Sequence, residues 1–405
     1  RWGLAPTIGL AWVISNENFM KNQSPIDFMK LRASFGIIQT DNIPSNGYWY
    51  TTMVGGSSYP IEDDFTGEGG WTEGTLSSLN GTTEKAYKYN LGLDMSLLKG
   101  LNLTVDGFYE RRSDIWVSSA GQTSSVLGAT SSYVNAGIVD SWGTEIGLDY
   151  TKKIGNFQLR AGGTFSYSRS KIIEMMESPQ AYDYLCSTGK PVGQIFGLQA
   201  TGYFMDDADV ANSIPQQFGP VRAGDIKYKD QNGDNKIDSK DVVKMCGTTT
   251  PEVWFGFNLH AGYKGFTVSA DFQGITGVTT NLLKSPLYKP LLNNGTISKT
   301  FLDRETPWTP GNQTNATMPR LTTQANANNY QNSSLWYRDA SFLKLRNLMI
   351  GYTFPKSMLK FSDMQVYVQG TNLFSLDNIK FADPEQLVAA YPSTRSFWAG
   401  VKFNF

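Results

Sequence analysis

The sequence is poor in the residues on which most catalytic and metal centres depend. Its 405 residues include one histidine, His260, and two cysteines, Cys186 and Cys246. Two cysteines are too few for a disulfide framework or a zinc cluster, and this pair can either join across a loop or stay free. No Gly-x-Ser-x-Gly elbow, phosphate-binding loop or zinc spacing occurs. We therefore expect no enzyme, and we expect His260 to make hydrogen bonds on the polar face of a strand.

Long apolar runs and a strong net charge are also missing. No stretch approaches twenty consecutive apolar residues, which excludes membrane-spanning helices. The net charge of −1 argues against nucleic acid as a partner. Charged residues make up 18% of the chain, below the quarter or so typical of soluble domains, while aromatic residues reach 13%. The negative mean hydropathy is compatible with strands in which every second residue faces lipid.

Eleven segments have the composition and alternation of strands about nine to eleven residues long or somewhat longer. In the last ten residues, Phe397, Ala399, Val401, Phe403 and Phe405 point one way and mostly polar residues the other. By itself, this run fits either a closing strand of a membrane barrel or a half-buried strand of a soluble sheet. The segments are 2–14, 30–39, 85–98, 101–113, 139–152, 156–169, 252–263, 266–276, 341–354, 363–373 and 395–405. The ninth breaks phase near Arg346 and Asn347, where a bulge would restore the alternation.

The connections between these segments alternate in length. Short turns at 99–100, 153–155, 264–265 and 355–362 separate long, Gly/Ser/Asn-rich excursions at 40–84, 114–138, 170–251, 277–340 and 374–394. Outer-membrane barrels have short periplasmic turns and long extracellular loops, whereas a soluble sandwich has no reason to put every long loop at one end. The sequence therefore predicts an all-β fold, a transmembrane antiparallel β-barrel with long extracellular loops.

Strand parity suggests that the barrel continues beyond this chain. The final strand runs toward the short-turn side, and counting back through eleven strands makes the first one run that way too. A closed even-stranded barrel then needs an odd number of strands before Arg1. The chain also starts within a strand-like segment, without Met or a signal peptide. We therefore expect residues 1–405 to be the carboxy-terminal part of a larger barrel.

The longest loop, 170–251, contains a twelve-residue segment with the ligand spacing of an EF-hand. Oxygen-bearing side chains occupy positions one, three, five, nine and twelve of 230–241, and Lys236 would supply its carbonyl at position seven. Position six is Asn235 instead of Gly, although Asn tolerates the left-handed conformation required there. The alternative is an acidic turn stabilised by Asx hydrogen bonds. We expect a structural calcium site whose ligands are Asp230, Asn232, Asp234, Lys236, Asp238 and Asp241, with Asp241 a shorter arm than the usual Glu.

Two loops are rich in aromatic residues. One carries Tyr48, Trp49, Tyr50, Tyr59 and Trp71, and the other carries Trp308, Tyr330, Trp336 and Tyr337. Aromatic faces in extracellular loops can stack on sugar rings or accept peptide side chains. They can equally pack loops together, bind a partner or form the membrane-interface girdle. We take Tyr48, Trp49, Tyr50, Trp71, Trp308 and Trp336 as candidate ligand contacts.

Several motifs together resemble one known family. They include Gly189-Lys-Pro-Val-Gly-Gln-Ile-Phe-Gly197, Ala223-Gly-Asp-Ile-Lys-Tyr-Lys-Asp230, Ser341-Phe-Leu-Lys-Leu-Arg-Asn347, Gly351-Tyr-Thr-Phe-Pro355 and Gly370-Thr-Asn-Leu-Phe374. In this order they are similar to the carboxy-terminal half of SusC-like TonB-dependent transporters of Bacteroidota. The matches span nearly the whole chain, but they are not specific to a substrate.

The resemblance implies a 22-stranded outer-membrane barrel with an amino-terminal plug and a segment that contacts TonB and thereby the ExbB–ExbD motor. It also implies a SusD-like surface lipoprotein acting as a lid, import of oligosaccharides or peptides, and the possibility that two transporter–lid pairs associate. The runner-up function is a passive porin or an adhesin anchor that binds ligands through its loops. A soluble β-sandwich is a distant third.

Overall fold

The computed structural model describes residues 3–20, 25–41, 54–60, 67–78, 80–129, 131–360, 362–379, 382–386 and 393–404. Eleven strands form one antiparallel sheet, and each pairs with the strands that precede and follow it in the list below. All eleven predicted strands are present, so the all-β expectation is confirmed. The strands are β1 Thr7–Val13, β2 Ile26–Thr40, β5 Glu84–Leu97, β6 Leu101–Ser118, β7 Tyr133–Ile154, β8 Phe157–Glu174, β13 Val253–Tyr263, β14 Phe266–Thr276, β17 Phe342–Phe354, β18 Asp363–Asp377 and β19 Ser396–Asn404.

The other elements are short and lie in the connections. Within the residues that the structure describes, none of the helices is long and apolar enough to cross a membrane. Four two-stranded sheets pair β3 Val54–Pro60 with β4 Gly67–Glu73, β9 Gln194–Gly197 with β12 Val243–Thr248, β10 Ala200–Tyr203 with β11 Ile226–Tyr228, and β15 Thr279–Asn281 with β16 Tyr337–Asp339. The helices are α1 Asp207–Asn212, α2 Lys299–Arg304 and α3 Lys356–Leu359.

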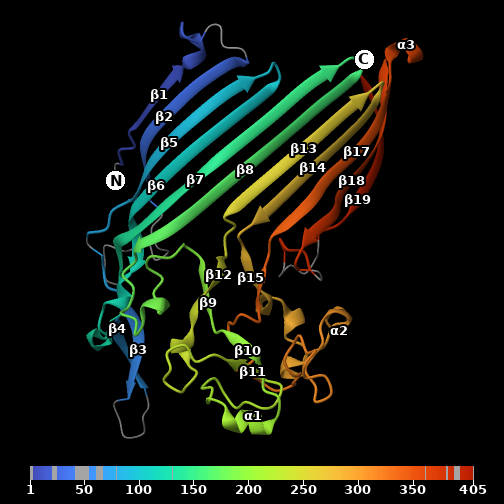
Figure 1. Cartoon of the computed structure of the whole chain (residues 1–405). Coiled ribbons are helices and arrows are strands. Elements are labelled where there is room, and N and C mark those ends of the chain that lie inside the picture. The colour runs from blue at the N-terminus through green and yellow to red at the C-terminus, as the bar shows by residue number, and fades with distance from the viewer. Residues whose placement is uncertain are drawn as a thin grey trace. The chain divides into compact units, whose positions relative to one another are not determined.

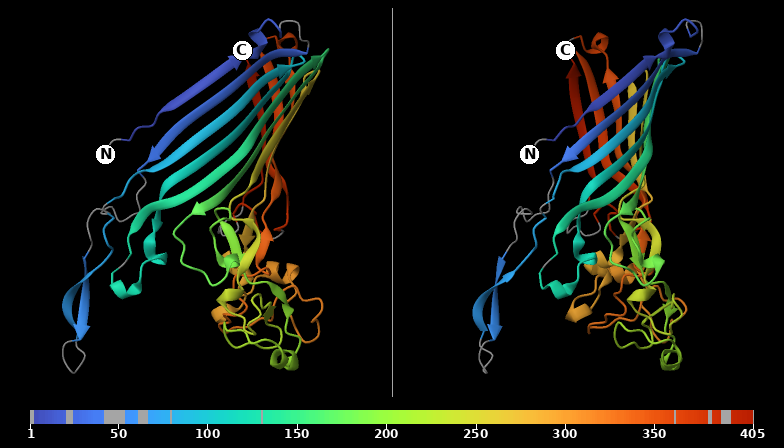
Figure 2. Two further views of the ribbon diagram at one scale, coloured as in Figure 1. Left: turned by 60° about the vertical axis from the view of Figure 1, so that its left-hand side comes forward. Right: turned by 90° about the vertical axis from the view of Figure 1, so that its left-hand side faces the viewer.

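The chain divides into two compact units. The first comprises residues 1–146 and 167–192, and the second comprises 147–166 and 193–405. In the first unit, the β3–β4 ribbon extends beyond the ends of β2 and β5 (Figure 2). In the second unit, the segments 193–252 and 277–341 fold together beyond the loop ends of β13, β14, β17 and β18 (Figure 1). We call these two segments the loop domain.

One face of the sheet is apolar, and many of its large side chains are exposed in the described part of the chain. Side chains that alternate along each strand are exposed there, as expected for strands that contact lipid. In water, such a face would cost about 25 cal/mol for each Å² left uncovered. The exposed residues include Tyr89 and Leu91 on β5, Phe257 and Leu259 on β13, Phe266 and Val268 on β14, Val366 and Val368 on β18, and Phe397, Val401 and Phe403 on β19.

The opposite face carries the charges. In the first unit, the guanidinium of Arg32 on β2 lies 2.9 Å from Asp94 on β5 and 3.0 Å from Asp106 on β6. Lys88 pairs with Glu110 at 3.1 Å on the same two strands, β5 and β6. These charged side chains are partly exposed, and their pairs bridge strands that also share backbone hydrogen bonds. A face built in this way suits a wet lumen.

The predicted irregularity of the ninth strand is confirmed. The pairing of β17 with β14 shifts register between Asp271 and Phe272, and its pairing with β18 shifts between Leu345 and Asn347. Arg346 is therefore the extra residue of a bulge. Its guanidinium turns to Gln273 Oε1 at 2.9 Å. A bulge aims one side chain differently from its neighbours, and here it aims a charge.

Candidate functional site

The loop domain of the second unit has a hydrophobic core of its own. Most of its central residues come from the two segments, which are far apart in sequence, and Ile275, Phe342 and Ile379 join them from the sheet side. Trp336 is 1% exposed and stacks on Tyr330, with ring centroids 6.0 Å apart, while Tyr288 meets it edge-on. The buried members are Leu198, Ile226, Tyr228, Ile237, Ile275, Val278, Leu282, Tyr288, Phe301, Met318, Trp336, Ala340, Phe342 and Ile379. The long connections are thus a folded body, which gives any loop site a rigid support.

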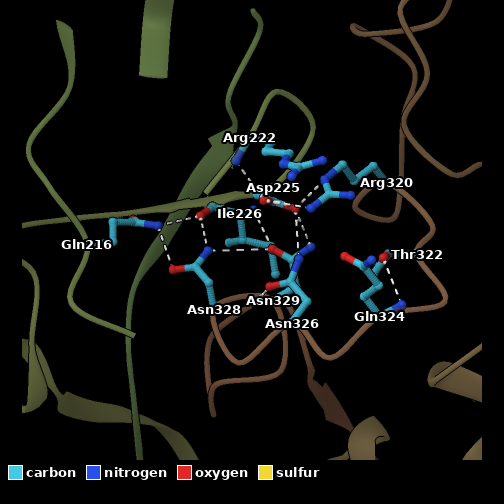
Figure 3. Close-up of polar contacts among 10 residues, drawn as sticks. All are labelled: Gln216, Arg222, Asp225, Ile226, Arg320, Thr322, Gln324, Asn326, Asn328 and Asn329. Atoms are coloured by element: carbon cyan, nitrogen blue, oxygen red, sulfur yellow. Dashed lines mark hydrogen bonds and ion pairs between the residues drawn. The ribbon is translucent and has the colours of Figure 1, made fainter. Parts of the chain in front are cut away.

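A buried carboxylate joins the two segments of the loop domain. Asp225 is 0% exposed, and its Oδ1 accepts hydrogen bonds from the side-chain amides of Asn326 at 3.0 Å and Asn329 at 2.8 Å (Figure 3). Its Oδ2 accepts from the backbone N–H of Arg222, and Arg320 supplies the opposite charge 2.8 Å from Oδ1. A buried carboxylate is stable only with such compensation.

The network continues through amide side chains. Asn328 Nδ2 donates to the carbonyl of Ile226, and Gln216 Nε2 donates to the same carbonyl and to Asn328 Oδ1 (Figure 3). Gly224, just before Asp225, has a φ of +84°, and a Cβ there would lie 2.3 Å from the ring of Trp308. In the motif at 223–225, Gly224 therefore allows the backbone to approach the ring of Trp308, and Asp225 supplies the buried charge.

The acidic loop 230–241 has the backbone expected at its centre. Asn235 has a φ of +61°, so the left-handed conformation predicted for position six is confirmed. The carboxylates of Asp230 and Asp234 accept hydrogen bonds from backbone N–H groups of the loop itself. Asp241 is 0% exposed and accepts from the N–H of Gln231 and of Asp238, each at 2.8 Å.

The contact of Asp234 with the N–H of Lys236, two residues on, is an Asx turn, the alternative that the sequence left open for this loop. Asn232, Asp238 and the backbone of Lys236 take part in the same pattern. Asp241 instead forms a capping box with Asp238. Within the described residues, no three His, Cys, Asp or Glu side chains converge on a point that suits a metal ion. The spacing and the left-handed Asn235 fit an EF-hand loop, while the carboxylates are turned to the backbone. Calcium stays a prediction.

The candidate ligand aromatics separate into exposed and buried ones. Trp71 on β4 is 77% exposed, whereas Trp308 is 7% exposed and Trp336 only 1%. The expectation that Trp308 and Trp336 offer a face to cargo does not fit this burial; they pack the loop domain instead. Burial also raises the pKa of Tyr330 and Tyr337, which the sequence grouped with them. Tyr48, Trp49, Tyr50 and the side chain of Tyr59 lie outside the described residues.

A hollow of about 830 Å³ opens where β13, β14, β17 and β18 meet the loop domain in the second unit. Phe255, Phe342 and Leu376 supply apolar walls, and Ser341 and Asp377 supply polar groups. Its volume is in the range of small-ligand sites, which are mostly apolar with a few placed polar groups.

Beside this hollow, the connection between β18 and β19 is fixed to the sheet by charge. Lys344 is buried and contacts both Asp383 and Glu385, and Arg346 on the bulge contacts Glu385. Burial pulls the pKa of each of these carboxyl groups upward. Lys344 offsets this for Asp383, and Arg346 with Lys344 does so for Glu385, so both pKa values lie below their usual range.

Sequence reasoning did not find this charge cluster. Lys344 and Arg346 stand in the motif 341–347, but only as a family resemblance, and nothing local ties them to Asp383 and Glu385 some forty residues away. Alternation was the available signal, because Lys344 and Arg346 are two residues apart on β17 and therefore share one side of the strand. Cys186 and Cys246, whose pairing the sequence left open, are both free thiols in the structure.

Comparison with known proteins places these features in a family. Residues 1–373 match the model of the TonB dependent receptor-like β-barrel. TonB-dependent receptor P26 of Formosa agariphila is 27% identical over 94% of this chain and 38% of its own length. TonB-dependent receptor SusC of Bacteroides thetaiotaomicron is 23% identical over 100% of this chain and 40% of its own length. The chain therefore spans about two fifths of these relatives.

Solved structures show the same fold. The RagAB peptide importer in its open-open state matches with a TM-score of 0.73 and 20% identity, over 98% of this chain and 42% of that chain. The RagAB peptide transporter matches with a TM-score of 0.73 and 21% identity. Together with the lipid-type face and the charged face of the sheet, these matches leave no place for a soluble sandwich. The chain belongs to the TonB-dependent receptor-like β-barrel family, whose SusC-like members are barrels of the outer membrane.

Proposed function

We propose that the protein carrying this chain imports nutrients across the outer membrane with energy supplied through TonB, ExbB and ExbD. The observation that carries the proposal is the family match over 1–373, combined with a sheet that has one apolar and one charged face. In this function, the chain supplies part of the barrel wall and the folded loops above it. A plug and further strands would come from the rest of the protein.

The cargo that we propose is an oligosaccharide or a short peptide, held with the help of a SusD-like lid lipoprotein. SusC-like sequence relatives and the fold shared with the RagAB peptide importer support this choice. The exposed Trp71 would stack on such a molecule or on the lid. We assign the protein no catalytic step.

Two experiments test this function. A strain lacking the protein should lose growth on its cargo, and a strain lacking TonB should lose the same growth. Growth that depends on the barrel but persists without TonB would instead support a passive porin or an adhesin anchor. Mass spectrometry of molecules that copurify with the full-length protein and its lid then identifies the cargo. A ladder of oligosaccharides indicates a glycan importer, and a mixture of peptides indicates a peptide importer.

We further propose that calcium binds the loop 230–241 and has a structural role. The donor spacing and the left-handed Asn235 support this, because they allow the loop to turn around an ion. Asp234→Ala should then increase cleavage of 170–251 by protease to the level seen when chelator is added to the wild type. If chelator leaves cleavage of the wild type unchanged, the Asx turns alone hold the loop.

A further inference from the structure

Three short turns place a lysine at a backbone position that disfavours it. The φ angle is +53° at Lys99, between β5 and β6, +46° at Lys264, between β13 and β14, and +69° at Lys360, which ends α3. Gly, Asn and Asp are the usual residues at left-handed positions in hairpin turns and helix ends, because other side chains crowd the backbone. Turn geometry therefore explains neither these lysines nor the apolar Leu98, whose φ is +52° in the same turn as Lys99. The features that remain are the charge of the lysines and the apolar side chains beside them.

The ammonium groups of these lysines are accessible to a ligand. All three residues are exposed, and within the described part of the chain none forms an ion pair with a carboxylate. The nearby carboxylates are used by the backbone instead: Asp27 accepts from the N–H of Lys99, and Asp363 accepts from the N–H of Lys356. The ammonium group of Lys264 lies 5.4 Å from the ring of Tyr263, which leaves its donors free.

Each of these lysines stands beside a large apolar side chain that is more than half exposed. Leu98 precedes Lys99, Tyr263 precedes Lys264, and Met358 lies in the helix that Lys360 ends. The turn between β7 and β8 repeats the pattern with Lys153 and Ile154. Side chains at a membrane–water interface are arranged in this way. The apolar side chain enters the acyl region of the lipid, and the neighbouring lysine extends toward the headgroups and water.

We propose that the short turns of each unit bind anionic phospholipid headgroups, with Lys99 in the first unit and Lys264 and Lys360 in the second contacting lipid phosphates. The strands end at these turns, so the apolar face of the sheet continues directly into the lysines. In each unit, this places cations at the depth where headgroups begin. The surface serves to hold the barrel at a fixed depth in the membrane and is independent of the cargo.

The test replaces charge without disturbing the turns. Asn suits left-handed positions better than Lys, so Lys99→Asn, Lys264→Asn and Lys360→Asn combined should fold at least as well as the wild type. The matched control is Lys229→Asn, Lys284→Asn and Lys299→Asn, which removes three exposed lysines from the loop domain. Both variants are made in the full-length protein, and heat-modifiable migration on a gel confirms that the barrel is folded.

Lipid preference is measured by native mass spectrometry after exchange in nanodiscs of phosphatidylcholine mixed with phosphatidylglycerol. The wild type should retain phosphatidylglycerol preferentially, and the turn variant should lose at least about tenfold of that preference, since each lysine near a lipid surface contributes about fivefold. The control variant should keep it. Salt should weaken the preference of the wild type. A turn variant as selective as the wild type, or a control that loses as much, would overturn the proposal.

Discussion

The loop domain and the sheet use apolar residues in opposite ways. In the loop domain, Trp336, Ile226 and Leu198 are buried and polar groups are mostly outside or paired. In the sheet, Leu91, Val268 and Val368 are exposed and the charges of Arg32, Asp94 and Asp106 face one another. The two regions therefore suit different surroundings. The loop domain buries its apolar side chains away from water, whereas the outer face of the sheet exposes apolar side chains that are stable in contact with lipid.

This difference decides what a charged side chain contributes in each region. Asp225 lies in a water-folded core, where its partners come from a segment about a hundred residues away. Its network therefore holds two long connections together. Arg32 lies on the charged face of a sheet whose backbone is already paired, so its contacts add to a structure that the ladder holds. The predictions below test this contrast in order of decreasing effect.

The largest effect should come from Asp225→Ala. The change removes the counter-charge of the partly buried Arg320 and leaves the buried amides of Asn326 and Asn329 without their acceptor, at a cost of about 3–5 kcal/mol to the loop domain. Protease should then cut within 193–252, while the barrel keeps its heat-modifiable migration. Asp207→Ala, at an exposed position on α1, is the control and should leave cleavage unchanged. A loop domain that resists protease without Asp225 would show that its apolar core suffices.

A pair of tryptophans sharpens the distinction between packing and ligand contact. Trp336→Ala removes a buried ring from the core and should cost the loop domain about 3–5 kcal/mol. Trp71→Ala changes an exposed ring and should alter stability by less than about 0.5 kcal/mol. Protease cleavage during thermal unfolding measures both, followed within the loop domain for Trp336→Ala and within 54–73 for Trp71→Ala. Cargo affinity should respond only to Trp71 among folded variants. Equal loss of stability would mean that Trp71 packs against another part of the full-length protein.

A charged substitution on the apolar face of the sheet should destabilise the fold, although this face is exposed. Val268→Arg places a guanidinium against lipid and should cost about 2–4 kcal/mol of folding free energy if the residue lies near the middle of the bilayer. Ser269→Arg, one residue along β14, points to the charged face and should cost much less. Urea titration in lipid vesicles measures both. Equal costs would contradict the assignment of the two faces.

Acid should loosen one segment without unfolding the rest. The pKa values of Asp383 and Glu385 in the folded protein lie below their ordinary values of about 3.9 and 4.3. Their contribution is therefore complete above those values and is lost as pH falls through the lower, folded values. Hydrogen exchange of residues 382–386, corrected for intrinsic rates, should accelerate below about pH 4. In Lys344→Met, exchange should already be fast at neutral pH, and slow exchange there would place the restraint elsewhere.

The sequence by itself determined the strands, their faces and the local turns. A period of two is a property of neighbouring residues, so all eleven strands and the bulge at Arg346 were visible without any tertiary contact. The left-handed Asn235 followed in the same way from a loop motif.

Tertiary structure decided which loop residues are buried and which charges meet. Trp308, Trp336 and Trp71 look alike in sequence, and only the folding of two distant segments around a common core separates them. Asp225 contacts Asn329, and Lys344 contacts Asp383, across long stretches of chain. No periodic pattern in the sequence predicts these pairs. Such contacts depend on the path that each long loop takes between its two strands, and the packing of the whole unit sets that path.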